Sequence, residues 1–343
     1  MPRTGKHPLK ISASHPSHEP CQVTITTAVH IPMQTGYWQN SFSVLRLFFD
    51  SLFASTSLPF DLMVLDNNSC PEVRDFLHGM RSEGRIQYLL ESQFNLRKLG
   101  AMQFLFSIAP GEYIAFTDSD VYFLPGWLES SLAVMNAFPL AGQVTALPTI
   151  DKSHSFVGNT MKGIHAQGDI AVEEGQDLIP MQFINAHRLS IGRSQEEYLK
   201  LASPRRDVRI TRGGISAFVS AQDFQFLTRR AVIEKVLPLE LNDQSEMYDQ
   251  VYSPIFEKKL EANGWWRLST TDYLVHHMGN ELPDMAEELK EIAPGLDIPG
   301  GSLSVKTHRA SSLWGRLMEI HRVRKWLKKI YTWSYNALFE NNK

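Results

Sequence analysis

Two hydrophobic periods alternate between Gln22 and Asp118, and this alternation constrains the fold more than any other feature of the chain. Four short apolar or β-branched runs predict strands, at 22–30, 60–66, 85–90 and 112–118. The segments between them carry apolar residues at helical spacing, such as Val44, Leu45, Phe48, Phe49 and Leu52. Strands that alternate with helices are joined by right-handed crossovers. The sequence therefore predicts an α/β fold, with a mixed, mostly parallel sheet and helices on both faces.

Polar residues stand where these strands end. Asp66, Asn67 and Asn68 follow the second strand, and Asp118 and Asp120 follow the fourth. Ligands of α/β sheets bind beyond the carboxyl ends of the strands, so these side chains are expected to outline a pocket. A purely structural interpretation stays equally open for the first group, because Asp and Asn also start turns and cap helices.

The pair Asp118 and Asp120 has a chemical interpretation. Two carboxylates within a few ångströms of each other repel, and the pKa of one rises unless a cation neutralises them. Mg²⁺ and Mn²⁺ prefer oxygen ligands, and a bound divalent cation can also hold a diphosphate. The Asp-x-Asp pattern predicts a metal and diphosphate site at this edge of the sheet.

Three segments in this order, "VLDNNS", "NLRKLGA" and "FTDSDVYF", resemble the inverting glycosyltransferases with the GT-A fold, and are similar to the large family 2 with its many bacterial polysaccharide enzymes. The resemblance covers about residues 21–280. It implies a Rossmann-like GT-A domain at 21–285, with a nucleotide-binding half at 21–123 and an acceptor half at 124–285.

The resemblance also implies a donor site. Its residues would be Asp66, Asn67, Arg97, Lys98, Gly100 and Asp118. Asp66 would contact the base or ribose, and Asp118 would hold the ribose or a metal-bound water. Arg97, Lys98 and Gly100 stand at a helix start, where amides and basic side chains favour the donor phosphates. The run "HIPMQTGYWQN" departs from the family pattern, which leaves the nucleotide open, with a UDP-sugar favoured.

The metal, Mn²⁺ or Mg²⁺, would be bound by Asp118, by Asp120 and by the late His277 in "HHMGN", with His276 as the alternative. This set is again implied by the resemblance. The competing interpretation of His277 is a half-buried structural histidine, since His is often intermediate in burial.

An inverting enzyme needs a base that removes the proton of the acceptor hydroxyl. Relatives use an Asp at a helix start, often in a Glu-Asp pair, and Asp249 in "NDQSEMYDQVYS" is the best match. Tyr248 stands where the Glu would be, so Glu246 and Asp243 remain rival bases. All three can also be helix-start carboxylates that the macrodipole favours.

The remaining segments are less regular. Residues 139–215 show few clean periods, with one short helix indicated by the capping box from Ser194 to Glu197. Residues 1–20 predict a flexible tail, because prolines interrupt any regular hydrogen bonding. The extension at 286–343 is expected to contain an amphipathic helix whose Lys, Arg and Trp residues suit an anionic membrane surface through 309–339. Packing of this helix on the catalytic domain is the alternative.

The net charge of −3 gives no reason to expect nucleic acid as a partner. Two cysteines form no disulfide framework, no signal peptide is recognisable and no apolar run could cross a bilayer. These features predict a cytoplasmic protein, or one peripheral on the cytoplasmic face of the membrane. A lipid-linked or other glycan acceptor would suit that location.

Together the features predict a metal-dependent, hexosyltransferase-like glycosyltransferase of polysaccharide biosynthesis. It would move a sugar from a nucleotide-diphosphate-sugar to a hydroxyl of a glycan or glycolipid, with inversion. One alternative is a sugar-nucleotide nucleotidyltransferase, although the loop after the first strand holds only Gly36 where a glycine-rich phosphate loop is usual. The other is a non-catalytic glycan-binding or scaffold protein. It stays open because Tyr248 stands where relatives have the Glu of the Glu-Asp pair.

Overall fold

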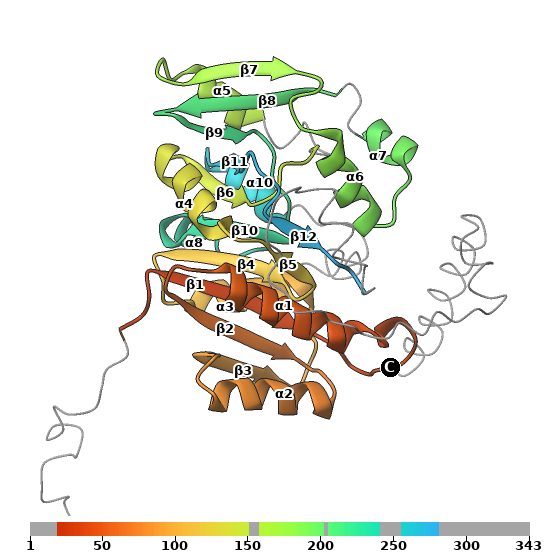
Figure 1. Ribbon diagram of the computed structural model, residues 1–343. Helices are drawn as coiled ribbons and strands as arrows, with labels where there is room; N and C mark the ends of the chain where they lie inside the picture. The colour runs from red at the N-terminus through yellow and green to blue at the C-terminus, as the bar shows by residue number, and fades with distance from the viewer. Residues whose placement is uncertain (1–18, 151–157, 202–204, 241–254, 281–343) are drawn as a thin grey trace, which may run out of the picture. The chain divides into compact units, whose positions relative to one another are not determined.

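The computed structural model describes residues 19–150, 158–201, 205–240 and 255–280 (Figure 1). Three sets of predicted features lie outside the described residues. They are the tail at 1–18, the candidate bases Asp243, Glu246 and Asp249, and the basic helix within 286–343.

Three strand–helix units and a fourth strand form the first half, as the hydrophobic periods predict. In chain order they are β1 (Val23–Val29), α1 (Ser41–Ser55), β2 (Phe60–Asn67), α2 (Pro71–Ser82), β3 (Tyr88–Ser92), α3 (Arg97–Ile108) and β4 (Tyr113–Asp118). The strands pair in parallel in the order β3-β2-β1-β4. The register sets Val29 opposite Asp66 and Ala28 opposite Asp118. Both aspartates therefore lie at the same edge of the sheet, on either side of β1.

The second half continues the same sheet with a different pattern of pairing. Its strands are β6 (Ala141–Thr145), β7 (Ala171–Gly175), β8 (Asp207–Arg212), β9 (Ile215–Phe218), β10 (Gln225–Arg229) and β11 (Trp266–Ser269). In the described residues the full order is β3-β2-β1-β4-β10-β6-β11-β9-β8-β7. β11 runs parallel to β6, whereas β10 lies antiparallel between β4 and β6. The start of β10 therefore lies beside the end of β4.

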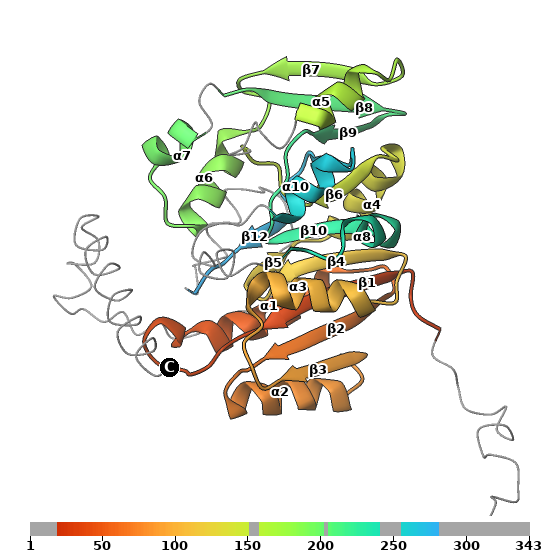
Figure 2. The ribbon, with the colours of Figure 1, turned by 180° about the vertical axis from the view of Figure 1, so that it is seen from behind.

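Helices cover both faces of this sheet, and the alternation along the strands shows which residues each face buries. Leu62 and Val64 of β2 belong to one apolar core, and Met63 and Leu65 belong to the other. The first core includes α1, α2 and α4 (Trp127–Ala137). The second includes α3, α8 (Arg230–Val236) and α10 (Ile255–Ala262), which lie in front of the sheet in Figure 2. The predicted α/β class with a mixed sheet and helices on both faces is confirmed.

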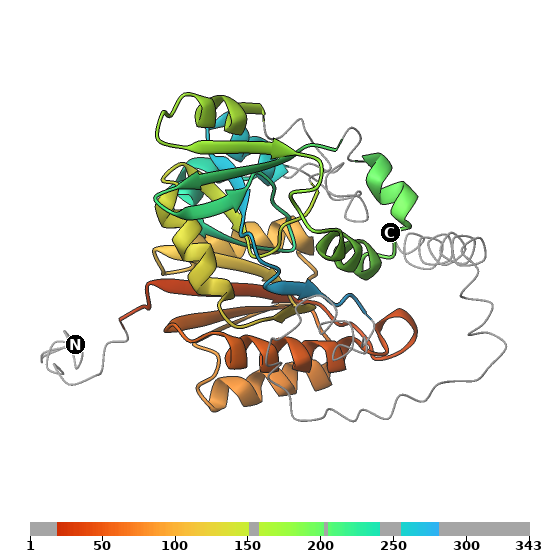
Figure 3. The same ribbon diagram turned by 45° about the horizontal axis from the view of Figure 1, so that its top comes forward.

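Residues 139–215 hold more regular structure than their sequence indicates. Besides β6, β7 and β8 they form α5 (Gly158–His165), α6 (Met181–Ser190) and the expected short helix α7 (Gln195–Leu201). A separate pair of strands, β5 (Val121–Phe123) and β12 (Val275–His277), lies beside α6 (Figure 3). Among the described helices, none combines the length and apolar character that crossing a bilayer requires.

Candidate active site

The β5–β12 pair brings the late histidine to the second aspartate. The chain leaves β4 at Asp118 and enters β5 at Val121, and the antiparallel register sets His277 opposite Val121. The Met278 amide donates to the carbonyl oxygen of Asp120 at 2.8 Å. The two side chains consequently meet, with His277 Nε2 3.4 Å from Asp120 Oδ2.

Asp118 has a different partner. Lys98 from the first turn of α3 donates to Asp118 Oδ2 at 2.8 Å and to Asp223 Oδ2 at 3.3 Å. These side chains are about one third exposed, at 33% for Lys98, 27% for Asp118 and 32% for Asp223. The site thus holds two neighbouring groups at the edge of the sheet: the pair Asp120 and His277, and the ion-paired cluster of Lys98, Asp118 and Asp223.

The charges of this cluster depend on one another. Burial raises the pKa of Asp118 to about 6, the carboxylates of Asp120 and Asp223 add to this rise, and Lys98 opposes it. Burial would lower the pKa of Lys98, but the carboxylates of Asp118 and Asp223 outweigh it and the pKa of Lys98 is raised. Lys98 therefore remains a cation at every pH near neutrality.

A divalent cation fits the atoms of the first group. Asp120 Oδ1 and His277 Nδ1 are both buried without a hydrogen-bond partner in the structure. Carboxylate oxygen suits Mg²⁺ or Mn²⁺, and imidazole nitrogen is a common metal ligand. In the described part of the chain no three His, Cys, Asp or Glu side chains are arranged as a ready metal site. Asp118, Asp120 and His277 as a three-residue ligand set therefore stay a prediction.

Asp66 and Asn67 lie at the expected edge and make local contacts there. Asp66 is 1% exposed, and its Oδ1 accepts the Ser69 amide at 3.0 Å, which is the turn that the structural interpretation expects. Asn67 Oδ1 accepts the Leu96 amide at 2.7 Å, and the Asn67 carbonyl oxygen lies 2.8 Å from His30 Nδ1. Asn67 thus links the loops after β1 and β3. Contact of Asp66 and Asn67 with a donor stays a prediction.

The three donor-site residues predicted at the start of α3, Arg97, Lys98 and Gly100, have different surroundings. Lys98 donates to Asp118, as described above. Arg97 is exposed and adopts a positive φ of 59° at the first position of the helix. A Cβ on Gly100 would meet only the Cβ of Leu96, at an ordinary 3.5 Å. Crowding in this structure therefore does not require a glycine at position 100.

Asp223 was not expected at the site. It comes just before β10, and the antiparallel direction of that strand brings its start to the carboxyl end of β4. The available signal was the run "SAQDF" ahead of the apolar "QFLTR", which would have to be recognised as an antiparallel strand. His276, the alternative metal ligand, is buried, and its Nδ1 is hydrogen-bonded to Tyr273 Oη at 2.7 Å. Burial lowers the pKa of His276 to about 4.

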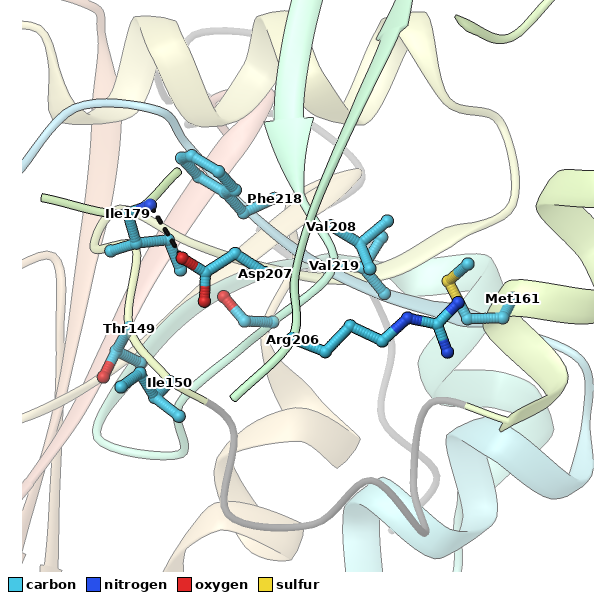
Figure 4. A pocket seen from close by; sticks show the side chains of 10 residues that line it. Thr149, Ile150, Met161, Ile179, Arg206, Asp207, Val208, Phe218 and Val219 are labelled. Atoms are coloured by element: carbon cyan, nitrogen blue, oxygen red, sulfur yellow. Dashed lines mark hydrogen bonds between the residues drawn. The ribbon is translucent and has the colours of Figure 1, made fainter. Parts of the chain in front are cut away.

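A cavity of about 120 Å³ lies elsewhere in the second half, between β8, β9, α5 and the segment after β6 (Figure 4). Its polar side chains already have partners. Asp207 Oδ2 accepts the Ile179 amide at 3.0 Å, and Thr149 Oγ1 lies 2.6 Å from Tyr198 Oη. None of the predicted site residues lines this cavity.

A buried carboxyl group next to the site gives a pH-dependent prediction. Glu257 in α10 is 2% exposed, and burial raises its pKa from 4.5 to about 7 against the opposing charge of Arg267. Between these values the folded chain binds more protons than the unfolded chain, so stability falls as pH rises through this window. The Glu257→Gln variant should therefore gain up to about 3 kcal/mol in unfolding free energy, relative to wild type, between pH 4 and pH 8. Urea denaturation at both pH values measures this, and an equal difference at the two would contradict it.

The fold and these two groups define an α/β protein with a cationic and acidic site at the carboxyl edge of its sheet, which is where such folds bind ligands. Residues 39–169 match the family model described as glycosyl transferase family 2. This match covers less than half of the 343-residue chain and includes Lys98, Asp118 and Asp120. It confirms the resemblance seen in the motifs, and it supports a glycosyltransferase as the class of enzyme.

Among the solved structures with some structural similarity to this chain are a mannosyltransferase, TarS and GalNAc-T7. A mannosyltransferase from Pyrobaculum calidifontis in complex with GDP-Man and Mn²⁺ is 17% identical over 38% of this chain and 36% of its own, with a TM-score of 0.31. S. aureus TarS 1-349 is 12% identical over 79% and 63%, with a TM-score of 0.40. GalNAc-T7 with UDP, GalNAc and Mn²⁺ is 10% identical over 75% and 43%, with a TM-score of 0.44.

This chain thus spans less than two thirds of the length of each of these proteins. Among curated proteins, none matches the sequence significantly.

Proposed function

We propose that the protein transfers a sugar from a nucleotide-diphosphate donor to a hydroxyl group of a glycan or glycolipid, with the help of Mn²⁺ or Mg²⁺ and with inversion. The observation that carries this proposal is the meeting of Asp120 and His277 beside the Lys98–Asp118 ion pair, in a chain whose residues 39–169 match a glycosyltransferase family model.

A bound divalent cation would stabilise the charge on the departing diphosphate. Asp120 and His277 would hold that cation through the two atoms that have no hydrogen-bond partner, Oδ1 and Nδ1, or through the facing pair Oδ2 and Nε2. Lys98 would turn part of its hydrogen bonding from the carboxylates toward a phosphate oxygen, because its ammonium group has three donors. Asp118 would then accept from the ribose or from a water molecule.

The remaining parts of the proposal come from the motif resemblance. Asp66, Asn67, Arg97 and Gly100 would complete the donor site, and Asp249 or Glu246 would be the base. The glycosyltransferase domain would span 21–285, with the extension at 286–343 bringing the protein to an anionic membrane surface on the cytoplasmic side. A UDP-sugar is the favoured donor, and no nucleic acid partner is proposed.

A panel of nucleotide sugars distinguishes this function from the alternatives. The full chain is incubated with UDP-, GDP- and dTDP-sugars, with Mn²⁺, with Mg²⁺ or with EDTA. We expect release of the nucleoside diphosphate from at least one donor with metal, and none with EDTA. A nucleotidyltransferase would instead require pyrophosphate and form a nucleoside triphosphate. Absence of any metal-dependent release of diphosphate, with or without glycan acceptors, would contradict the proposal. If no nucleoside triphosphate formed with pyrophosphate either, a binding protein would be favoured.

A further inference from the structure

One irregular segment, Ser220–Phe224, contacts both groups of the site. The Phe224 carbonyl oxygen accepts the Asp118 amide at 2.7 Å, and Asp223 Oδ2 accepts from Lys98. The ring of Phe224 meets the ring of His277 edge to face, with centroids 5.4 Å apart. The segment forms neither helix nor strand, so other contacts must fix its position. We call it the 220–224 segment.

Buried side chains of β6 and β11 supply those contacts. The Gln222 amide donates to Thr145 Oγ1 at 2.9 Å, and the Gln222 carbonyl oxygen accepts from Gln143 Nε2 at 2.9 Å. Arg267 donates from Nη2 to the Ala221 carbonyl oxygen at 3.1 Å and from Nε to Gln143 Oε1 at 3.0 Å. Arg267 therefore holds the 220–224 segment directly and also orients the amide of Gln143 that holds the next residue.

Arg267 is an unusual residue for this position. It is 1% exposed in β11, inside the sheet, where a charged side chain is expensive unless it is paired. The carboxyl group of Glu257, also buried, supplies an opposite charge only when it is ionised, because its pKa is about 7. A packed apolar side chain in such a place is often as stable as a buried ion pair. Hydrogen bonds to the 220–224 segment give the arginine a role that an apolar side chain could not replace.

We propose that Arg267 is a positioning residue, which fixes the 220–224 segment so that Asp223 and Phe224 hold Lys98, Asp118 and His277 in the geometry that binds the metal and diphosphate. This inference rests on the proposed function for its ligand. Residues that orient metal ligands from a distance typically contribute 10- to 100-fold to metal affinity.

The test compares Arg267→Met with Arg229→Met in the full chain. Arg229 is a matched control, because it also donates to main-chain carbonyl oxygens, those of Pro139 and Ala141, each at 3.1 Å. It does so at the far end of β10, where Arg229 pairs with Tyr113 at the start of β4. Both variants lose an arginine that holds carbonyl groups, but only one of them affects the 220–224 segment.

Two measurements follow. Electron paramagnetic resonance of Mn²⁺ and calorimetry of UDP with Mn²⁺ should show affinities about 10-fold or more weaker in Arg267→Met, and within about 2-fold of wild type in Arg229→Met. Hydrogen exchange should be about 10-fold or more faster for the amides of Gln222 and Asp118 in Arg267→Met than in the control, because release of the 220–224 segment frees the Gln222 amide and the Phe224 carbonyl oxygen that accepts from Asp118.

Thr145→Val is the second variant, for use where Arg267→Met does not fold. It removes only the hydroxyl group that pairs with Gln222 and keeps the side-chain shape. It should also speed exchange at Gln222 and weaken Mn²⁺ binding.

Equal rates of hydrogen exchange in the 220–224 segment of the control and the test variants would overturn the inference. This outcome does not depend on which ligand the protein binds. If wild type binds Mn²⁺ and UDP, test variants that bind both with unchanged affinity would overturn the inference as well. Failure of wild type to bind UDP with Mn²⁺ would instead count against the proposed function, and faster exchange would still support the positioning role.

Discussion

Replacement of Asp120 by asparagine is expected to lower metal-dependent release of nucleoside diphosphate by about 10³-fold. Asn keeps the shape of the side chain and one oxygen, but it loses the negative charge that binds a cation. Asp120 lies 3.4 Å from His277 and has one buried oxygen without a hydrogen-bond partner, so its carboxylate is available to a cation. Steady-state release of diphosphate across a Mn²⁺ titration measures the effect.

Asp272→Asn is the control, since it removes the same charge from an exposed aspartate on the connection between β11 and β12. It should leave turnover within about 2-fold of wild type. Full turnover in Asp120→Asn would exclude a role of Asp120 in metal binding.

The Lys98→Met variant should lose activity and stability together. Removal of the ammonium group leaves the carboxylates of Asp118 and Asp223 without their cation, and it removes the group proposed to contact the diphosphate. We expect kcat/KM to fall about 10²-fold. We expect the unfolding free energy to fall by about 2 kcal/mol, which is less than for a fully buried pair because about a third of each side chain is exposed.

A second change separates these two effects. In Lys98→Met/Asp223→Asn one of the unpaired carboxylates is gone, so part of the lost stability should return, while kcat/KM should stay low. Denaturation by urea and steady-state kinetics of the two single variants and the double variant give the coupling energy. Stability losses of the two single variants that simply add up in the double variant would show that the ion pair between Lys98 and Asp223 contributes nothing.

The first four strands could be predicted because both faces of that part of the sheet are covered. Continuous apolar runs such as 60–66 then alternate with helices of clear period, and the two periods differ enough to be recognised. The position of Asp118 and Asp66 at one edge follows from parallel pairing alone. The metal and donor roles came from the resemblance to glycosyltransferases and stay predictions. The match of residues 39–169 to a glycosyltransferase family model supports the resemblance itself.

The second half could not be predicted in the same way. β7 and β8 lie at the edge of the sheet, and ion pairs such as Glu173–Arg209 and Glu174–Arg206 occupy their exposed side chains. β7 shows no apolar alternation, and the alternation of β8 is limited to Val208 and Ile210. The pairing of β10 with β4 depends on contacts between residues more than a hundred positions apart, which no local period reveals. Asp223 was missed for that reason.

The ion pair between Lys98 and Asp223 joins the two predicted halves of the domain, 21–123 and 124–285. Lys98 comes from the first, and Asp223, like His277, comes from the second. A chain that ended after residue 123 would also expose β4 as an apolar edge strand, with its unpaired main-chain groups open to aggregation. The first half is therefore not a self-sufficient nucleotide-binding module. Its reactive groups acquire their geometry only when the later strands have joined the sheet, so assembly of the site and completion of the fold are the same event.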